Sequence, residues 1–177
     1  IGLYLAYLTG WWILLFSFLG FLGAYFYVGP PFKWAYRGLG EIVIALSYGP
    51  LMVLGSHYLQ ARTIRVIPFY VSLLCGLSVF CLAILNEIPD YYQDILVGKR
   101  NLVVRMGKQK AIKFLKLCFV GIFLLLALGL ILRKIPSLAM VNFLLLPWLL
   151  KSLSITEKNY DNLGMFRSAI NANVVIY

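Results

Sequence analysis

Three oxygen-bearing side chains, Asn86, Asp90 and Asp94, recur at intervals of four residues near the middle of the chain. In a helix this spacing brings the side chains to one face. Two carboxylates placed in this way repel each other unless a proton or a cation lies between them. Magnesium prefers oxygen ligands and commonly bridges one or two carboxylates to a substrate phosphate. The spacing therefore makes Asn86, Asp90 and Asp94 candidates for a site at which Mg²⁺ bridges carboxylates to a phosphate.

Basic residues follow the acidic ones directly, in Gly98-Lys99-Arg100. Lys99 and Arg100 could bind phosphate oxygens through charge-assisted hydrogen bonds. A second polar stretch, residues 33–41, adds Arg37 as a further phosphate ligand and Glu41 at a helix start, where the helix dipole favours an acid. Acid, metal and base together describe a diphosphate site. The alternative for both stretches is an ordinary solvated loop with basic residues and a helix-capping acid.

The composition indicates which elements must position these side chains. Of the 177 residues, 62% are hydrophobic and 12% charged, and the mean hydropathy is +0.88. A soluble domain has about half apolar and a quarter charged residues, so lipid must cover much of this surface. The net charge of +10 does not indicate nucleic-acid binding, because the basic residues lie in short loops rather than in one stripe. The sequence therefore predicts an all-α, polytopic transmembrane helical bundle embedded in a lipid bilayer.

The apolar runs divide this bundle into spans. We expect complete helices over residues 11–27, 40–60, 66–86, 116–133 and 135–150, and partial helices over 1–8 and from Phe166 onward. Pro89 should end a span or begin a short new helix, and Gly98 should end that helix. We expect residues 1–177 to form a single transmembrane domain that is truncated at both ends.

The distribution of basic residues predicts the orientation in the membrane. If loops alternate sides, the side with the acidic cluster carries twelve basic residues: Lys33, Arg37, Lys99, Arg100, Arg105, Lys108, Lys110, Lys113, Lys116, Lys151, Lys158 and Arg167. The other side carries four: Arg62, Arg65, Arg133 and Lys134. The positive-inside rule assigns the richer side to the cytoplasm, at the plasma (inner) membrane. We expect one cavity, open toward that side, to be faced by Asn86, Asp90, Arg37, Lys99 and Arg100.

The segment from Asn86 through Gly98-Lys99-Arg100-Asn101-Leu102-Val103-Val104-Arg105-Met106-Gly107 resembles the second aspartate-rich motif of the UbiA superfamily of membrane prenyltransferases. The loop Tyr36-Arg37-Gly38-Leu39-Gly40-Glu41 is most similar to the 1,4-dihydroxy-2-naphthoate prenyltransferases of menaquinone synthesis. The resemblance implies a nine-helix bundle around a central cavity in which two such motifs hold magnesium and a prenyl diphosphate. By the resemblance Asn86, Asp90 and Asp94 would hold the Mg²⁺ ion, with Asp90 and Asp94 as catalytic residues, and Arg37, Lys99 and Arg100 would contact the diphosphate. The first motif is expected upstream of Ile1.

By this resemblance the partners are a polyprenyl diphosphate and an aromatic acceptor. Three alternatives remain open at this point. The first is an enzyme of the same superfamily with another acceptor, such as 4-hydroxybenzoate, homogentisate, haem or a glycerol phosphate lipid. The second is a cation- or proton-coupled transporter, although transporter carboxylates usually lie near the bilayer midplane. The third is a membrane interaction subunit without chemistry, against which the three oxygen-bearing residues argue.

Overall fold

The computed structural model describes residues 2–159, and every element within that range is helical, as predicted. The elements are α1 (Gly2–Thr9), α2 (Trp12–Val28), the 3₁₀ turn η1 (Trp34–Tyr36), α3 (Gly40–Leu46), the π-helical turn η2 (Ser47–Leu51), α4 (Met52–Ala61), α5 (Val66–Glu87), α6 (Tyr91–Leu96), α7 (Leu102–Met106), α8 (Lys108–Ile131), the 3₁₀ helix η3 (Ser137–Leu145) and α9 (Leu146–Asn159). The helix expected from Phe166 lies outside the described residues.

Within residues 2–159, four helical stretches are long and apolar enough to cross a membrane: Gly40–Ala61, Val66–Glu87, Lys108–Ile131 and Ser137–Lys158. The apolar helix α2 is shorter, with 17 residues. Only 17 to 22% of the residues in the most apolar part of each stretch are buried within the chain, so most of their side chains keep surface that the chain itself does not cover. Lipid can cover such apolar surfaces. Helices are compatible with lipid because each helix forms its own backbone hydrogen bonds. The chain is an integral membrane protein.

Two predicted span boundaries are wrong. Helix α8 begins at Lys108 rather than at Lys116, and the last span extends to Lys158 rather than ending at Leu150. Both errors arise because charge was used to mark the helix end, whereas lysine is a good helix former whose long stem can carry the ammonium group to the interface. Lys116 also pairs with Glu157 across α8 and α9, so both charges are accommodated inside the helices.

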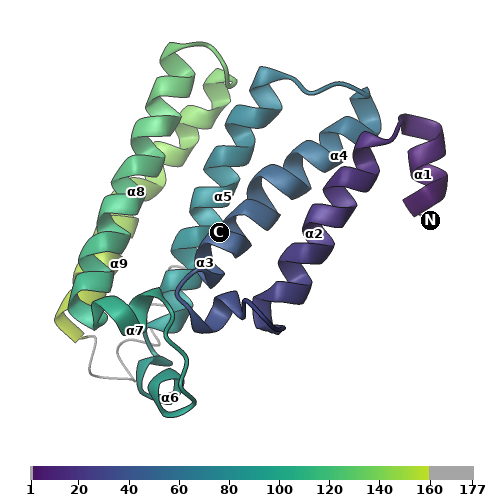
Figure 1. Ribbon diagram of the computed structural model, residues 1–177. Helices are drawn as coiled ribbons and strands as arrows, with labels where there is room; N and C mark the ends of the chain where they lie inside the picture. Colours follow the sequence, from purple (N-terminus) through teal and green to yellow (C-terminus); the bar gives the residue numbers. More distant parts are fainter. Residues whose placement is uncertain (1, 160–177) are drawn as a thin grey trace.

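Figure 1 shows the long helices standing side by side in chain order, with α5 in the middle between the α3–η2–α4 stretch and α8. The α2–α3 and α5–α8 connections lie at one end of the bundle, together with α6 and α7, and we call this the α6–α7 end. The α4–α5 and α8–η3 connections, which carry Arg62, Arg65, Arg133 and Lys134, lie at the opposite end. The alternation of loops on which the orientation was predicted is therefore confirmed for the described residues, with Arg167 outside them.

The best-packed part of the bundle lies near the α6–α7 end. Its buried side chains come from α5, α7, α8, α9 and the turn after α5: Cys81, Ile84, Leu85, Ile88, Val103, Ala111, Ile112, Leu115, Phe119, Leu149 and Leu153. Val103 belongs to the short helix α7, so this helix is attached to the long helices by an apolar contact as well as by its polar flanks. The polar segment between α5 and α8 is thus folded back onto the bundle.

A second close contact holds the α3–η2–α4 stretch against α5. Pro50 has no backbone N–H and interrupts the regular hydrogen bonding, and the chain forms the wider π turn there. At this turn a Cβ on Gly49 would lie 2.6 Å from both the Gly76 Cα and the Ser72 carbonyl oxygen. Only glycine permits this approach, which is typical of helix packing in membranes.

We expect Gly49→Ala to destabilise the protein by about 1–3 kcal/mol, because the new methyl group meets backbone atoms that cannot move aside. Thermal unfolding of the full-length protein in detergent measures the effect. Gly121→Ala in α8 is the matched control, since a Cβ there meets nothing within 4 Å. Equal melting temperatures for Gly49→Ala and wild type would contradict the close packing of η2 on α5.

Candidate active site

Two helices carry the oxygen-bearing residues Asn86, Asp90 and Asp94. Helix α5 ends at Glu87, residues 88–90 form a turn, and Asp90 is the N-cap of α6. Asn86 therefore belongs to the last turn of α5, whereas Asp94 belongs to α6. The prediction of one shared helical face is wrong, because Pro89 interrupts the helix, as expected from its missing N–H and bulky ring. The predicted stop at Gly98 is confirmed: α6 ends at Leu96, and Gly98 has a φ of +74°.

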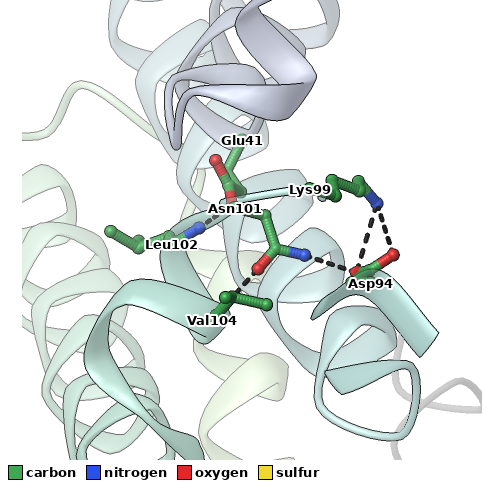
Figure 2. A network of polar contacts seen from close by, with 6 residues as sticks. All are labelled: Glu41, Asp94, Lys99, Asn101, Leu102 and Val104. Carbon is green, nitrogen blue, oxygen red and sulfur yellow. Dashed lines mark hydrogen bonds and ion pairs between the residues drawn. The ribbon is translucent and has the colours of Figure 1, made fainter. Parts of the chain in front are cut away.

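Asp94 is buried and both of its carboxylate oxygens have partners (Figure 2). The Asn101 side-chain amide donates to Oδ2 at 2.6 Å, and the Lys99 ammonium lies 3.2 Å from Oδ1 and 3.3 Å from Oδ2. The Lys99 backbone N–H also donates to the Asp94 carbonyl oxygen at 2.9 Å. Asp94 thus fixes the turn that leads from α6 to the basic segment.

The Lys99 ammonium keeps its charge in this setting. Partial burial favours the neutral amine, but the hydrogen bond to Asp94 and its negative charge outweigh that effect, so the pKa of Lys99 is raised. A raised folded-state pKa contributes stability that is fully present below the unfolded value of about 10.4 and is lost only as pH rises through the folded value. Lys99 therefore offers a permanent positive charge across the neutral pH range.

Asn101 is a site residue that the sequence analysis missed. Its side chain is 1% exposed and makes two contacts: Nδ2 donates to Asp94, and Oδ1 accepts from the Val104 backbone N–H at 2.8 Å. Asn101 is thereby the N-cap of α7 and the link between α7 and α6. An asparagine immediately before an apolar helical run is a helix-start signal that could have identified it.

Glu41 joins the two polar stretches. It lies in the first turn of α3, as predicted, and is only 1% exposed. Its Oε1 accepts the backbone N–H of Leu102 at 2.6 Å, a contact drawn in Figure 2. The Arg100 backbone N–H adds a second link by donating to the Tyr36 carbonyl oxygen at 3.1 Å. The 33–41 loop and the basic segment, 61 residues apart, are therefore in direct contact at the α6–α7 end, which confirms that the two stretches share one membrane face.

Arg37 and Arg100 both have exposed side chains at this end. The Arg37 guanidinium donates to the Pro31 carbonyl oxygen at 3.2 Å, a contact within its own loop. Two exposed guanidinium groups and the Lys99 ammonium, carried by contacting segments, form a positively charged surface that suits a phosphate-bearing ligand.

A cavity of about 950 Å³ lies between α2, the α3–η2–α4 stretch and α5. Its lining is mainly apolar, with Tyr27 and Asn86 among the polar members. Of the predicted site residues, Asn86 alone lines this cavity in the part of the chain that the structure describes. The expectation that Asp90, Arg37, Lys99 and Arg100 also face it is not met, since their segments lie beyond the helix ends, where the connections fold over the bundle.

The donor atoms near the end of α5 suit a hard cation, although they form a partial set. Within residues 2–159 no group of three or more His, Cys, Asp or Glu side chains is gathered closely enough to hold a metal ion. Asn86 and Asp90 are exposed. The Glu87 carboxyl group lies beside that of Glu41, and the Oε2 atom of each is buried without a hydrogen-bond donor among the described residues. Two carboxyl groups in this state are satisfied by a proton shared between them or by a bound cation.

The helical membrane fold agrees with what comparison with known proteins shows. The model of the UbiA prenyltransferase family matches residues 1–170, so the chain belongs to that family. The family predicted from the second aspartate-rich motif is confirmed.

Three curated relatives illustrate the similarity. The chain is 28% identical over 141 residues to a 2-carboxy-1,4-naphthoquinone phytyltransferase of Synechocystis, which covers 80% of this chain and 46% of the relative. It is 28% identical over 119 residues to a 1,4-dihydroxy-2-naphthoate octaprenyltransferase of Bacillus subtilis, which covers 67% of this chain and 38% of the relative. It is 35% identical over 95 residues to the Escherichia coli protein of the same name, which covers 54% of this chain and 31% of the relative. The chain thus spans less than half the length of these relatives. No solved structure matches it.

We expect Asn101→Ala to lower the stability of the α6–α7 region by about 1–3 kcal/mol, because α7 loses its N-cap and a buried Asp94 oxygen loses a donor. Hydrogen–deuterium exchange over residues 94–107 and thermal unfolding measure the loss. Asn142→Ala is the control, since the Asn142 amide makes one exposed contact, to the Ala139 carbonyl oxygen. Unchanged exchange in Asn101→Ala would contradict the capping role.

Proposed function

We propose that the whole protein transfers a prenyl group from a polyprenyl diphosphate to 1,4-dihydroxy-2-naphthoate in menaquinone biosynthesis. The observation that carries the proposal is the contact between the basic 99–105 segment and the 36–41 loop at one end of an apolar cavity that Asn86 lines. A prenyl diphosphate has a charged head and a long apolar tail, and these neighbouring surfaces suit its two parts. The names of the curated relatives favour a naphthoate acceptor.

In this proposal Arg37, Lys99 and Arg100 bind the diphosphate, and Asn86, Asp90 and Asp94 belong to the metal site. The partial donor set is compatible with magnesium, which commonly takes one or two protein carboxylates and completes its shell with substrate phosphates and water. When bound, Mg²⁺ would supply positive charge to the departing diphosphate. Asp94, whose oxygens already bind Lys99 and Asn101, would act largely by holding the basic segment in place.

The reaction breaks the bond between the allylic carbon and the diphosphate oxygen, and the electron pair leaves with the diphosphate. Lys99 and the two arginines stabilise that negative charge. The apolar cavity keeps water from the allylic cation until an electron-rich carbon of the acceptor ring bonds to it. With dihydroxynaphthoate as acceptor, the ring carboxylate leaves as carbon dioxide.

We further propose that the α6–α7 end faces the cytoplasm across the plasma (inner) membrane, since the basic residues concentrate there. A different aromatic acceptor is the nearest alternative. The transporter alternative is less compatible with the site, because Asp90 and Asp94 lie on a connection beyond the end of α5 rather than at mid-membrane.

We expect Asp90→Asn to reduce prenyl transfer by at least about 100-fold, because the change removes a hard anionic ligand. The Asp90 side chain is exposed, so the substitution should disturb the packing little. Lys99→Ala should be milder, since neighbouring arginines partly replace its charge. The assay uses the full-length protein in membranes with labelled prenyl diphosphate and dihydroxynaphthoate, with and without a chelator.

Gln93→Ala is the matched control on the exposed surface of α6 and should retain activity. Parallel reactions with 4-hydroxybenzoate and homogentisate identify the acceptor. Full activity of Asp90→Asn, or activity indifferent to the chelator, would contradict the metal-site assignment. An absence of transfer to every acceptor in wild-type membranes would contradict the proposed function itself.

A further inference from the structure

The Glu41 carboxylate is the most deeply buried acid of the described chain, at 1% exposure, and only one of its oxygens has a donor. Removing a carboxylate from water is costly unless hydrogen bonds or opposite charges compensate. The donor to Glu41 is the backbone N–H of Leu102, and Leu102 is the first helical residue of α7. Glu41 therefore stabilises the start of a helix that is remote in the sequence.

Helix α7 needs this help because it has only five residues. A helix so short is unstable alone, and its first N–H groups have no partners within it. Asn101 takes the Val104 N–H and Glu41 takes the Leu102 N–H, so two buried oxygens cap one helix start.

The capped start of α7 follows Lys99 and Arg100 without an intervening loop. Gly38 lies close to the same segment: its φ is +70°, and a Cβ there would lie 2.7 Å from the Arg105 Nε. The Arg105 Nε in turn donates to the Arg100 carbonyl oxygen at 3.0 Å. The backbone on either side of the basic pair is thus held by contacts with the 36–41 loop, and the Glu41 carboxylate supplies one of them. The Lys99 ammonium itself is held by Asp94.

We propose that Glu41 is a positioning residue of the enzyme, which acts by anchoring the Leu102 amide and so holding Lys99 and Arg100 where they bind the diphosphate. This inference rests on the proposed function. The acceptor oxygen rather than the negative charge is the active feature, so glutamine should replace glutamate and leucine should not. Substrate binding should be affected selectively, because the basic pair contacts the diphosphate and not the aromatic acceptor.

The test compares Glu41→Gln and Glu41→Leu in the full-length protein, with Ile42→Leu as the control on the exposed face of the same turn. We expect Glu41→Leu to raise the KM for prenyl diphosphate about tenfold, the effect of losing one hydrogen bond of about 1.4 kcal/mol. The KM for dihydroxynaphthoate should stay within about twofold, and Glu41→Gln should resemble wild type in both constants. Hydrogen–deuterium exchange at residues 99–106 should accelerate in Glu41→Leu and remain slow in Glu41→Gln.

Three results would overturn the proposal. Equal impairment of Glu41→Gln and Glu41→Leu would mean that the charge acts, for example on a cation beside Glu87, and not the hydrogen bond. A parallel rise of both KM values with a lowered melting temperature would mean a structural role only. Unchanged hydrogen–deuterium exchange at residues 99–106 in Glu41→Leu would show that Glu41 does not anchor this segment, whatever the activity. An inactive wild type with normal exchange effects would instead refute the proposed function, and the role of Glu41 in catalysis with it.

Discussion

The hydrogen bond from the Leu102 amide to the Glu41 carboxylate joins the two polar segments of a chain that is otherwise built for lipid. The long helices can satisfy their backbones internally, but the connection between α5 and α8 has to turn, start two short helices and stay near the membrane surface. Its free N–H groups need acceptors that are present at fixed positions. Glu41 and Asn101 provide them, and the arrangement of the candidate site follows from this capping.

Asp94 has a related place in the architecture. Its two oxygens bind Lys99 and Asn101, so a buried negative charge is compensated by one cation and one amide. Breaking such a set leaves a charge without a partner, which is why buried ionic groups at this end are expected to be sensitive to substitution. The same contacts orient the basic segment, so the packing of this end and the placement of its basic residues depend on the same side chains. The membership of the chain in the UbiA prenyltransferase family gives this arrangement its chemical meaning.

The apolar cavity and the polar end are separate environments that meet at Asn86. On the side of Asn86 away from the α6–α7 end, α2, the α3–η2–α4 stretch and α5 line the cavity with mainly apolar side chains. The close approach of Gly49 and Gly76 sets the distance between two of these helical walls. At the α6–α7 end, the charged side chains of Arg37, Asp90 and Arg100 are exposed. A ligand with a charged head and an apolar tail would experience both environments without either being compromised.

The sequence by itself determined the class of structure, the family and the gathering of the polar residues at one end of the bundle. These properties depend on the length of apolar runs, on the distribution of charge and on a motif whose residues are contiguous, all of which are local. It also indicated the helix break at Pro89, because a missing N–H is a property of one residue. The start of α8 at Lys108 was missed, since lysine is compatible with both a loop and a helix.

Only the tertiary structure decided what each polar residue touches. Asp90 and Asp94 occupy different environments although they are four residues apart, because the turn after α5 leaves one exposed and buries the other. Glu41 was expected to serve its own helix, and it also caps α7, 61 residues further along the chain. Such a pairing depends on how two loops meet at the end of a bundle, and no local spacing encodes that distance. For this reason the sequence could name the candidate residues, whereas their division between binding and positioning required the fold.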